Sequence, residues 1–337
     1  MISALIEYGL FFAKTATLLI ALVIALTLIF SLSRRDKTAE RLIIKNINQK
    51  YDTMRQLMEY EVLDKKLLKK TNKEHKKENK IKKKEGADKT KQRLFVLNFK
   101  GDIRATAVAS LREEVTALLT VANKEDEVLL CLENSGGTVH EHGLAASQLL
   151  RIRQREIPLV IAVDKVAASG GYLMACTANK IIAAPFAIIG SIGVLAQIPN
   201  FHRILEKHGV DFEQITAGKY KRTITMFGKN TDEDREKLKQ DLEEIHDLFK
   251  SSITQYRAEL DIEQVATGEH WYGQQALELK LVDELMTSDD YLLEKSKVAD
   301  LFEITYQQKK KLGKKLGAAA KGMWEEFSND MSTRWKH

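Results

Sequence analysis

The longest hydrophobic segment of the chain lies near its N-terminus. From Tyr8 to Leu32 the only charged residue is Lys14, and the part from Thr15 to Leu32 is uninterrupted. A helix of this length can cross the hydrocarbon core of a bilayer. Glu7 precedes the segment and Arg34 follows it, which favours an uncleaved anchor over a cleaved signal peptide. The pattern therefore predicts a transmembrane anchor over residues 1–34.

The segment from residue 35 to residue 92 is polar and basic. It has no glycine before Gly86 and no proline, and the apolar residues of its first half are spaced as in an amphipathic helix. From Lys65 to Lys91 the segment becomes a lysine run mixed with a few acids. Such a run can bind anionic lipid or nucleic acid, but a solvated helix or flexible stalk is the commoner structure. We predict a basic helical or flexible stalk and expect no nucleic-acid partner.

From residue 93 on, short apolar segments alternate with longer amphipathic ones. We predict strands at residues 94–99, 128–133, 159–164, 180–184 and 212–216, and helices at residues 105–123, 141–153 and 235–260. This alternation is typical of an α/β fold. We assign residues 93–290 to one domain and residues 291–337 to a basic C-terminal tail.

A second apolar run, from Ile181 to Ile198, is also long enough to cross a membrane. It contains Pro185, Gly190 and Gly193, which interrupt a helix. We therefore predict that it forms a buried strand-and-turn core.

Composition changes this picture little. The 337 residues carry a net charge of +6, but the excess of basic residues lies in the stalk and the tail, so it does not identify a substrate. Cys131 and Cys176 both lie in apolar surroundings, and we predict buried free thiols. His140 and His142 are spaced like metal ligands, but no carboxylate or cysteine array accompanies them. We expect neither a metal nor a cofactor.

The candidate chemistry centres on Ser169. This serine lies between a predicted strand and a segment that begins with Gly170-Gly171 and continues as a predicted helix from Tyr172 to Ala178. Free N–H groups and the positive dipole end of a helix would face an incoming acyl oxygen there. The glycines would let a substrate carbonyl approach the backbone. Taken alone, however, this segment is more commonly a helix start without chemistry.

Three other segments add to the site. The strand at residues 128–133 runs into Asn134-Ser135-Gly136-Gly137, where a bare N–H could join that of Gly170 in an oxyanion hole. Residues 190–193 supply a second hydroxyl, and residues 216–222 supply candidate bases. No histidine lies in a comparable motif, so a serine–lysine pair fits better than a Ser-His-Asp triad.

Together these motifs resemble the signal-peptide-peptidase family of membrane serine proteases. The resemblance covers about residues 93–290, and its matching segments are residues 134–139, 164–171, 184–194, 217–222, 268–276 and 281–284. The chain departs from the family pattern at two positions. Ser135 stands where the family usually has proline, and Lys280 stands where it often has glycine.

The resemblance implies a role for each matching residue. Ser169 would be the nucleophile, and Lys221, the last residue of a Gly-x-x-Lys pattern, the general base. Ser191 would orient that lysine, and Gly137 and Gly170 would donate to the oxyanion. A lysine accepts a proton only when neutral, so this chemistry requires an apolar pocket that lowers the pKa of the amine from its free value near ~10.4.

The resemblance also implies an architecture and a location. The fold would be the ββα spiral shared by crotonases and Clp protease, assembled as a ring or dome in which one copy's lysine completes its neighbour's serine site. The location would be the bacterial inner membrane, with the catalytic domain often periplasmic. Arg34, Arg35 and Lys37 instead favour a cytoplasmic domain, so the side of the membrane stays open.

The leading hypothesis is a membrane-anchored serine endopeptidase that cleaves short hydrophobic peptides such as signal-peptide remnants. One alternative is a crotonase-type acyl-CoA enzyme, which shares the fold and the oxyanion hole but needs neither Ser169 nor Lys221. The other alternative is a proteolytically inert membrane scaffold.

Overall fold

The computed structural model describes residues 2–34, 41–71, 73, 77 and 91–308. It divides into two units, residues 1–42 with residues 307–337, and residues 43–306. Much of the predicted lysine run and the basic tail beyond residue 308 lie outside the described residues.

The first unit contains one long helix, α1 (Ile2–Arg34). Across the described residues, no helix combines the length and the hydropathy that a membrane span requires. The anchor predicted over residues 1–34 therefore has no support from the structure.

The second unit is built on a seven-stranded sheet. Its strands run in the order β1-β10-β2-β3-β4-β6-β9, and every pair from β10 to β9 is parallel. The strands are β1 (Arg41–Asn46), β2 (Arg93–Lys100), β3 (Glu127–Glu133), β4 (Leu159–Val163), β6 (Lys180–Ala183), β9 (Glu284–Leu285) and β10 (Asp300–Gln307). The α/β class predicted from the sequence is confirmed.

Both faces of this sheet are covered, which explains why the interiors of β3 and β4 are apolar without interruption. On β2, the side chains of Phe95, Leu97 and Phe99 join the larger core cluster, whereas those of Leu94 and Val96 join the smaller one on the opposite face. The larger cluster also contains side chains from α4 (Val108–Leu119), α5 (Val139–Arg153) and α6 (Gly170–Ala175). The smaller cluster includes side chains of α2 (Ile47–Val62) and α11 (Ser288–Lys295).

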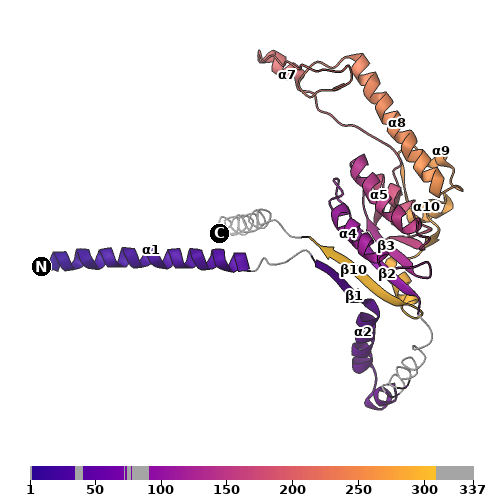
Figure 1. The fold of residues 1–337 in the computed structure, drawn as a ribbon, viewed down its shortest axis with the longest axis horizontal. Coiled ribbons are helices and arrows are strands. Elements are labelled where there is room, and N and C mark those ends of the chain that lie inside the picture. The colour runs from indigo at the N-terminus through magenta and orange to yellow at the C-terminus, as the bar shows by residue number, and fades with distance from the viewer. Residues whose placement is uncertain (1, 35–40, 72, 74–76, 78–90, 309–337) are drawn as a thin grey trace, which may run out of the picture. The chain divides into compact units, whose positions relative to one another are not determined.

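A second, three-stranded sheet carries the candidate site. It has the order β5-β7-β8, formed by β5 (Val166–Ala168), β7 (Ile188–Gly190) and β8 (His270–Tyr272). The remaining helices are α7 (His202–Lys207), α8 (Asp232–Tyr256), α9 (Ile262–Val265) and α10 (Gly273–Glu278). Figure 1 shows α8 extending from the sheet region toward α7.

Residues 194–231 and the N-terminal half of α8 form what we call the arm. None of its residues is buried, whereas Phe249 and Ile253 near the C-terminal end of α8 pack into the larger core. The strand predicted at residues 212–216 lies in the arm, and this prediction is wrong. Two polar residues, Glu213 and Gln214, separate Phe212 from Ile215, the segment has no partner strand, and Ile215 is 94% exposed.

The sequence also placed the end of the sheet too early. Helix α11 continues past residue 290 to Lys295 and strand β10 follows it, where a basic tail was expected, and β10 pairs with β2. Within the apolar run from Ile181 to Ile198, Phe186 between the strands is 85% exposed, but β6, β7 and then Ile192 supply buried side chains, as predicted for a strand-and-turn core. Beyond that point the run enters the arm and becomes exposed.

The part of the predicted stalk that forms α2 belongs to the second unit and packs within it. Asn48 on α2 accepts a hydrogen bond from the N–H of Leu301 (2.7 Å), and its amide donates to the carbonyls of Ser296 (3.1 Å) and Ala299 (3.0 Å). Ile47 is buried beside it. These contacts fix α2 to the segment that joins α11 to β10.

One buried carboxyl predicts how stability depends on pH. Glu114 on α4 is 4% exposed and accepts a hydrogen bond from the N–H of Tyr306 (2.8 Å). Burial raises the pKa of Glu114 from 4.5 to about 7. The pKa of Glu114 is therefore higher in the folded chain than in the unfolded chain. Its contribution to stability is complete below about pH 4.5 and is lost as the pH rises through 7.

We therefore expect Glu114→Gln to raise the free energy of unfolding at pH 8 by roughly 1–3 kcal/mol and to have little effect at pH 5. Glutamine can still accept the Tyr306 hydrogen bond but carries no charge. Glu113→Gln, at the exposed neighbouring position, is the matched control. Urea unfolding at both pH values measures the difference, and equal effects of the two substitutions would contradict the prediction.

Candidate active site

Three segments that are distant in sequence meet at Ser169. Strand β5 ends immediately before Ser169, and β7 ends immediately before Ser191. The two strands are parallel, and Ala168 pairs with Gly190, so the two serines leave the sheet next to each other. On the other side of β5, Asn134 forms a β-bridge with Ala167. The glycine turn and both serines are thus positioned by backbone pairing.

The backbone of Ser169 adopts an unusual conformation. Its φ of 53° lies in the left-handed region, which costs on the order of 1–3 kcal/mol for a residue other than glycine. The conformation is held from both sides, because the Ser169 N–H donates to Gly190 O (2.7 Å) and Ser169 O accepts from the Leu173 N–H (3.0 Å). A strained serine between a strand and a helix resembles the nucleophile turn of α/β-hydrolases.

The glycine turn packs directly against this serine. A Cβ at Gly136 would lie 2.6 Å from Ser169 Cβ and 2.9 Å from Gly170 N, so only glycine fits there. Gly137 has a φ of 156° and is exposed beside it. Within the described residues, neither the Gly137 nor the Gly170 N–H has a hydrogen-bond partner. Both amides are therefore free to bind an oxyanion.

Two buried polar side chains hold the turn in place. The Asn134 side chain accepts a hydrogen bond from the Gly136 N–H (2.8 Å), and its Oδ1 lies 3.3 Å from Nε2 of His142. Nδ1 of His142 lies 2.9 Å from Thr138 O. A Cβ at Gly170 would meet the His142 ring at 2.5 Å.

Sequence reasoning considered His142 only as a metal ligand and missed this supporting role. The signal was its place on α5, on the helical face that also carries the buried Ala145, Ala146 and Leu149. Among the residues described here, no group of three or more potential metal ligands is found.

A cleft of about 1030 Å³ contains this site. Ser169, Ser191, Gly137 and Gly170 all line it. Its walls are mainly apolar and come from the segments around the site, the start of the arm and α8; they include Ile103, Val139, Leu173, Val194, Leu195, Leu248 and Phe249. The cleft can therefore hold an apolar ligand against a hydroxyl and two free amides.

Lys221 does not line this cleft. It is exposed on the arm and lines a separate cavity of about 820 Å³ together with Ile198, Phe212 and Phe227. Of the five site residues predicted from the sequence, the structure brings four together and leaves the lysine apart.

The neighbouring Lys219 has a different environment. It forms an ion pair with Glu233 (2.9 Å) and lies over the ring of Tyr220. The hydrogen bond to Glu233, followed by that to Tyr220, raises the pKa of Lys219. A lysine held charged in this way is a poor general base.

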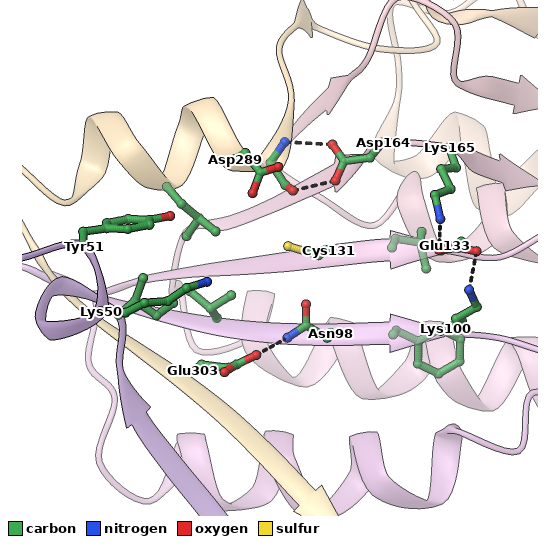
Figure 2. A pocket seen from close by; sticks show the side chains of 16 residues that line it. Lys50, Tyr51, Asn98, Lys100, Cys131, Glu133, Asp164, Lys165, Asp289 and Glu303 are labelled. Carbon is green, nitrogen blue, oxygen red and sulfur yellow. Dashed lines mark hydrogen bonds and ion pairs between the residues drawn. The ribbon is translucent and has the colours of Figure 1, made fainter. Parts of the chain in front are cut away.

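A third cavity, of about 380 Å³, lies on the face of the large sheet that carries the smaller core cluster (Figure 2). Its charged groups are largely paired with each other: Glu133 bridges Lys100 and Lys165, and Asp164 accepts hydrogen bonds from Ser288. Burial raises the pKa of the Cys131 thiol at its floor to about 12, so the thiol stays protonated at neutral pH. Both Cys131 and Cys176 are free, as predicted; Cys176 is buried, whereas Cys131 is half-buried.

Comparisons with known proteins identify the family. The N-terminal model of peptidase family S49 matches residues 3–149, and the peptidase family S49 model matches residues 151–301. The chain belongs to peptidase family S49.

Its relatives are named as proteases. "Probable protease SohB" of Haemophilus influenzae is 49% identical, covering 93% of this chain and 92% of that protein. "Probable protease SohB" of Buchnera aphidicola (subspecies Acyrthosiphon pisum) is 59% identical over 66% of each chain. A solved structure of ClpP1 from Listeria monocytogenes is 14% identical with a TM-score of 0.40, covering 58% of this chain and 94% of that chain. The ββα spiral stays a prediction.

Proposed function

We propose that this chain is a serine endopeptidase with Ser169 as its nucleophile. The observation that carries the proposal is the strained Ser169 packed against the Gly136-Gly137 turn, with two amides that lack hydrogen-bond partners lining the same cleft. This arrangement fits acyl transfer, in which negative charge develops on a carbonyl oxygen. Membership of a peptidase family favours this function over the acyl-CoA and scaffold alternatives.

In the proposed reaction, Ser169 Oγ attacks the scissile carbonyl carbon while its proton passes to a neutral lysine amine. The Gly137 and Gly170 amides bind the resulting oxyanion. The carbon–nitrogen bond then breaks, and the lysine returns the proton to the departing amine. Water, deprotonated by the same lysine, hydrolyses the acyl-enzyme and releases Ser169.

We propose Lys221 as this lysine, supplied by a neighbouring copy of the chain. Lys219 contacts Glu233 in the first turn of α8, whereas the Ser169 cleft is lined by α8 only from Ile245 on. Twelve residues of helix separate these points, a distance of roughly 18 Å at ~1.5 Å per residue. A lysine carried at the far end of the arm is better placed for another copy's cleft. Ser191 would then orient it.

The arm offers a surface for such an assembly. Leu195, Ile204, Val210 and Ile215 are exposed on it, and no residue of the arm is buried in the single chain. Head-to-tail contacts through an element of this kind close into a ring when the rotation between copies is suitable. The proposed substrates are short hydrophobic peptides such as signal-peptide remnants, in keeping with the apolar cleft walls.

Mixing two inactive variants tests the shared site. We expect Ser169→Ala and Lys221→Ala chains, each inactive alone, to regain part of the peptidase activity after subunit exchange, roughly a quarter of the sites for random pairing in a 1:1 mixture. A site made by two copies can then combine an intact serine with an intact lysine. No recovery, once exchange has been verified with differently tagged chains, would place both residues of each site on one chain.

We also propose, on the sequence alone, that residues 1–34 anchor the enzyme in the bacterial inner membrane. The supporting observation is the uninterrupted apolar run from Thr15 to Leu32. We expect the full chain to stay in the membrane fraction after an alkaline carbonate wash, and a chain that begins at Arg41 to be released. Release of the full chain would contradict the anchor.

A further inference from the structure

The wall that α8 contributes to the Ser169 cleft contains one unusual polar group. Ile245, His246, Leu248, Phe249 and Ser252 line the cleft from this helix. Nε2 of His246 is shielded from solvent, and in the part of the chain that the structure describes it is the one buried side-chain nitrogen or oxygen without a hydrogen-bond partner. Buried polar groups are paired in the great majority of cases, so this exception has a cost that needs an explanation.

The other histidine of the cleft is different. Both ring nitrogens of His142 already face oxygen atoms, at 2.9 Å (Thr138 O) and 3.3 Å (Asn134 Oδ1), and support the glycine turn. Of the two imidazoles that line the cleft, His246 alone has a ring nitrogen left for a ligand.

A peptide bound in the cleft can satisfy that nitrogen. An imidazole nitrogen donates or accepts according to its tautomer, and a peptide backbone offers both a carbonyl oxygen and an N–H. Phe249, three residues on along α8, is buried and lines the same cleft, and hydrogen bonds in apolar surroundings gain strength because water competes less. A turn of the ring about its side-chain bonds would present the shielded Nε2 to the cleft, and such side-chain motions are fast.

We propose that His246 is a substrate-binding residue whose Nε2 hydrogen-bonds a backbone group of the peptide in the Ser169 cleft. This proposal rests on the proposed peptidase function. Helix α8 would then contribute a direct polar contact with the substrate in addition to its apolar wall. The cleft would recognise the peptide backbone as well as the substrate's side chains.

The test compares His246→Phe with His246→Gln in the full-length chain, using a fluorogenic hydrophobic peptide. Phenylalanine keeps a ring without the nitrogen, whereas glutamine keeps a polar group of similar reach. We expect His246→Phe to raise KM about 5- to 20-fold with kcat within about 2-fold, because a contact made equally in the ground and transition states affects KM alone. His246→Gln should recover most of the affinity. Ser251→Ala is the control, because Ser251 lies on the same helix but is exposed and does not line the cleft.

A second readout separates substrate binding from damage to the site. The rate at which a small fluorophosphonate labels the enzyme should be unchanged in His246→Phe, because this probe has no peptide backbone. An unchanged KM in His246→Phe, equal KM increases in the Phe and Gln variants, or a parallel loss of labelling would each overturn the proposal.

Peptide binding to Ser169→Ala chains distinguishes this proposal from the proposed function. Adding His246→Phe to that background should weaken binding by the same 5- to 20-fold, whether or not Ser169 is the nucleophile. Undiminished binding would refute the role of His246. If His246→Phe weakens binding but the wild-type chain cleaves no peptide, the peptidase function alone is refuted.

Discussion

Replacing Ser169 with alanine is expected to lower kcat for peptide hydrolysis by about 10⁵- to 10⁶-fold. The substitution removes the attacking hydroxyl, and in serine peptidases the loss of the nucleophile alone has an effect of this size. The fold should be retained, because the contacts that hold Ser169 in its left-handed conformation are made by its backbone N–H and carbonyl. Thermal unfolding of the variant should therefore resemble that of the wild type.

Ser252→Ala is the matched control for Ser169→Ala. Ser252 lines the same cleft, but its hydroxyl donates to Leu248 O within α8. We expect activity within about 3-fold of the wild type. If Ser169→Ala also kept activity within a few-fold, Ser169 would not be the nucleophile.

Replacing Lys221 with alanine is expected to lower kcat by about 10²- to 10⁴-fold, the usual contribution of a general base. Lys219→Ala, two residues away, should leave activity within a few-fold of the wild type, because Lys219 is exposed and paired with Glu233. Steady-state rates on one peptide substrate compare the two variants. If Lys219→Ala lost activity and Lys221→Ala retained it, the general base would be Lys219 and the proposed assignment to Lys221 would be wrong.

The sequence predicted the central sheet well because burial on both faces makes its strands distinctive. Strands β2, β3, β4 and β6 lie within a residue of their predicted bounds at either end. The short strands β5, β7 and β8 were not predicted, since three residues are too few to show a period. The error at residues 212–216 has a different cause: the segment has only two apolar residues, Phe212 and Ile215, and a strand also needs a partner, which sequence pattern does not supply.

The candidate site was partly predictable because some of its residues belong to motifs that are visible in the local sequence. Glycine pairs and a serine at a strand end are local signals, and Ser169, Gly137 and Gly170 meet in one cleft. The packing of Gly136 against Ser169 and the support of the turn by Asn134 and His142 depend on tertiary contacts. The position of Lys221 depends on how the arm is placed, which the local motif around Gly218 does not determine.

The most direct test of the account is covalent labelling of the purified full-length chain with a fluorophosphonate, followed by proteolysis and mass-spectrometric mapping of the modified residue. A serine that is activated by a base and faces an oxyanion hole reacts with this probe, whereas ordinary serines do not. The account predicts a label on Ser169 that is absent from Ser169→Ala and strongly reduced in Lys221→Ala. An unlabelled chain, or a label on a different serine, would contradict the central claim.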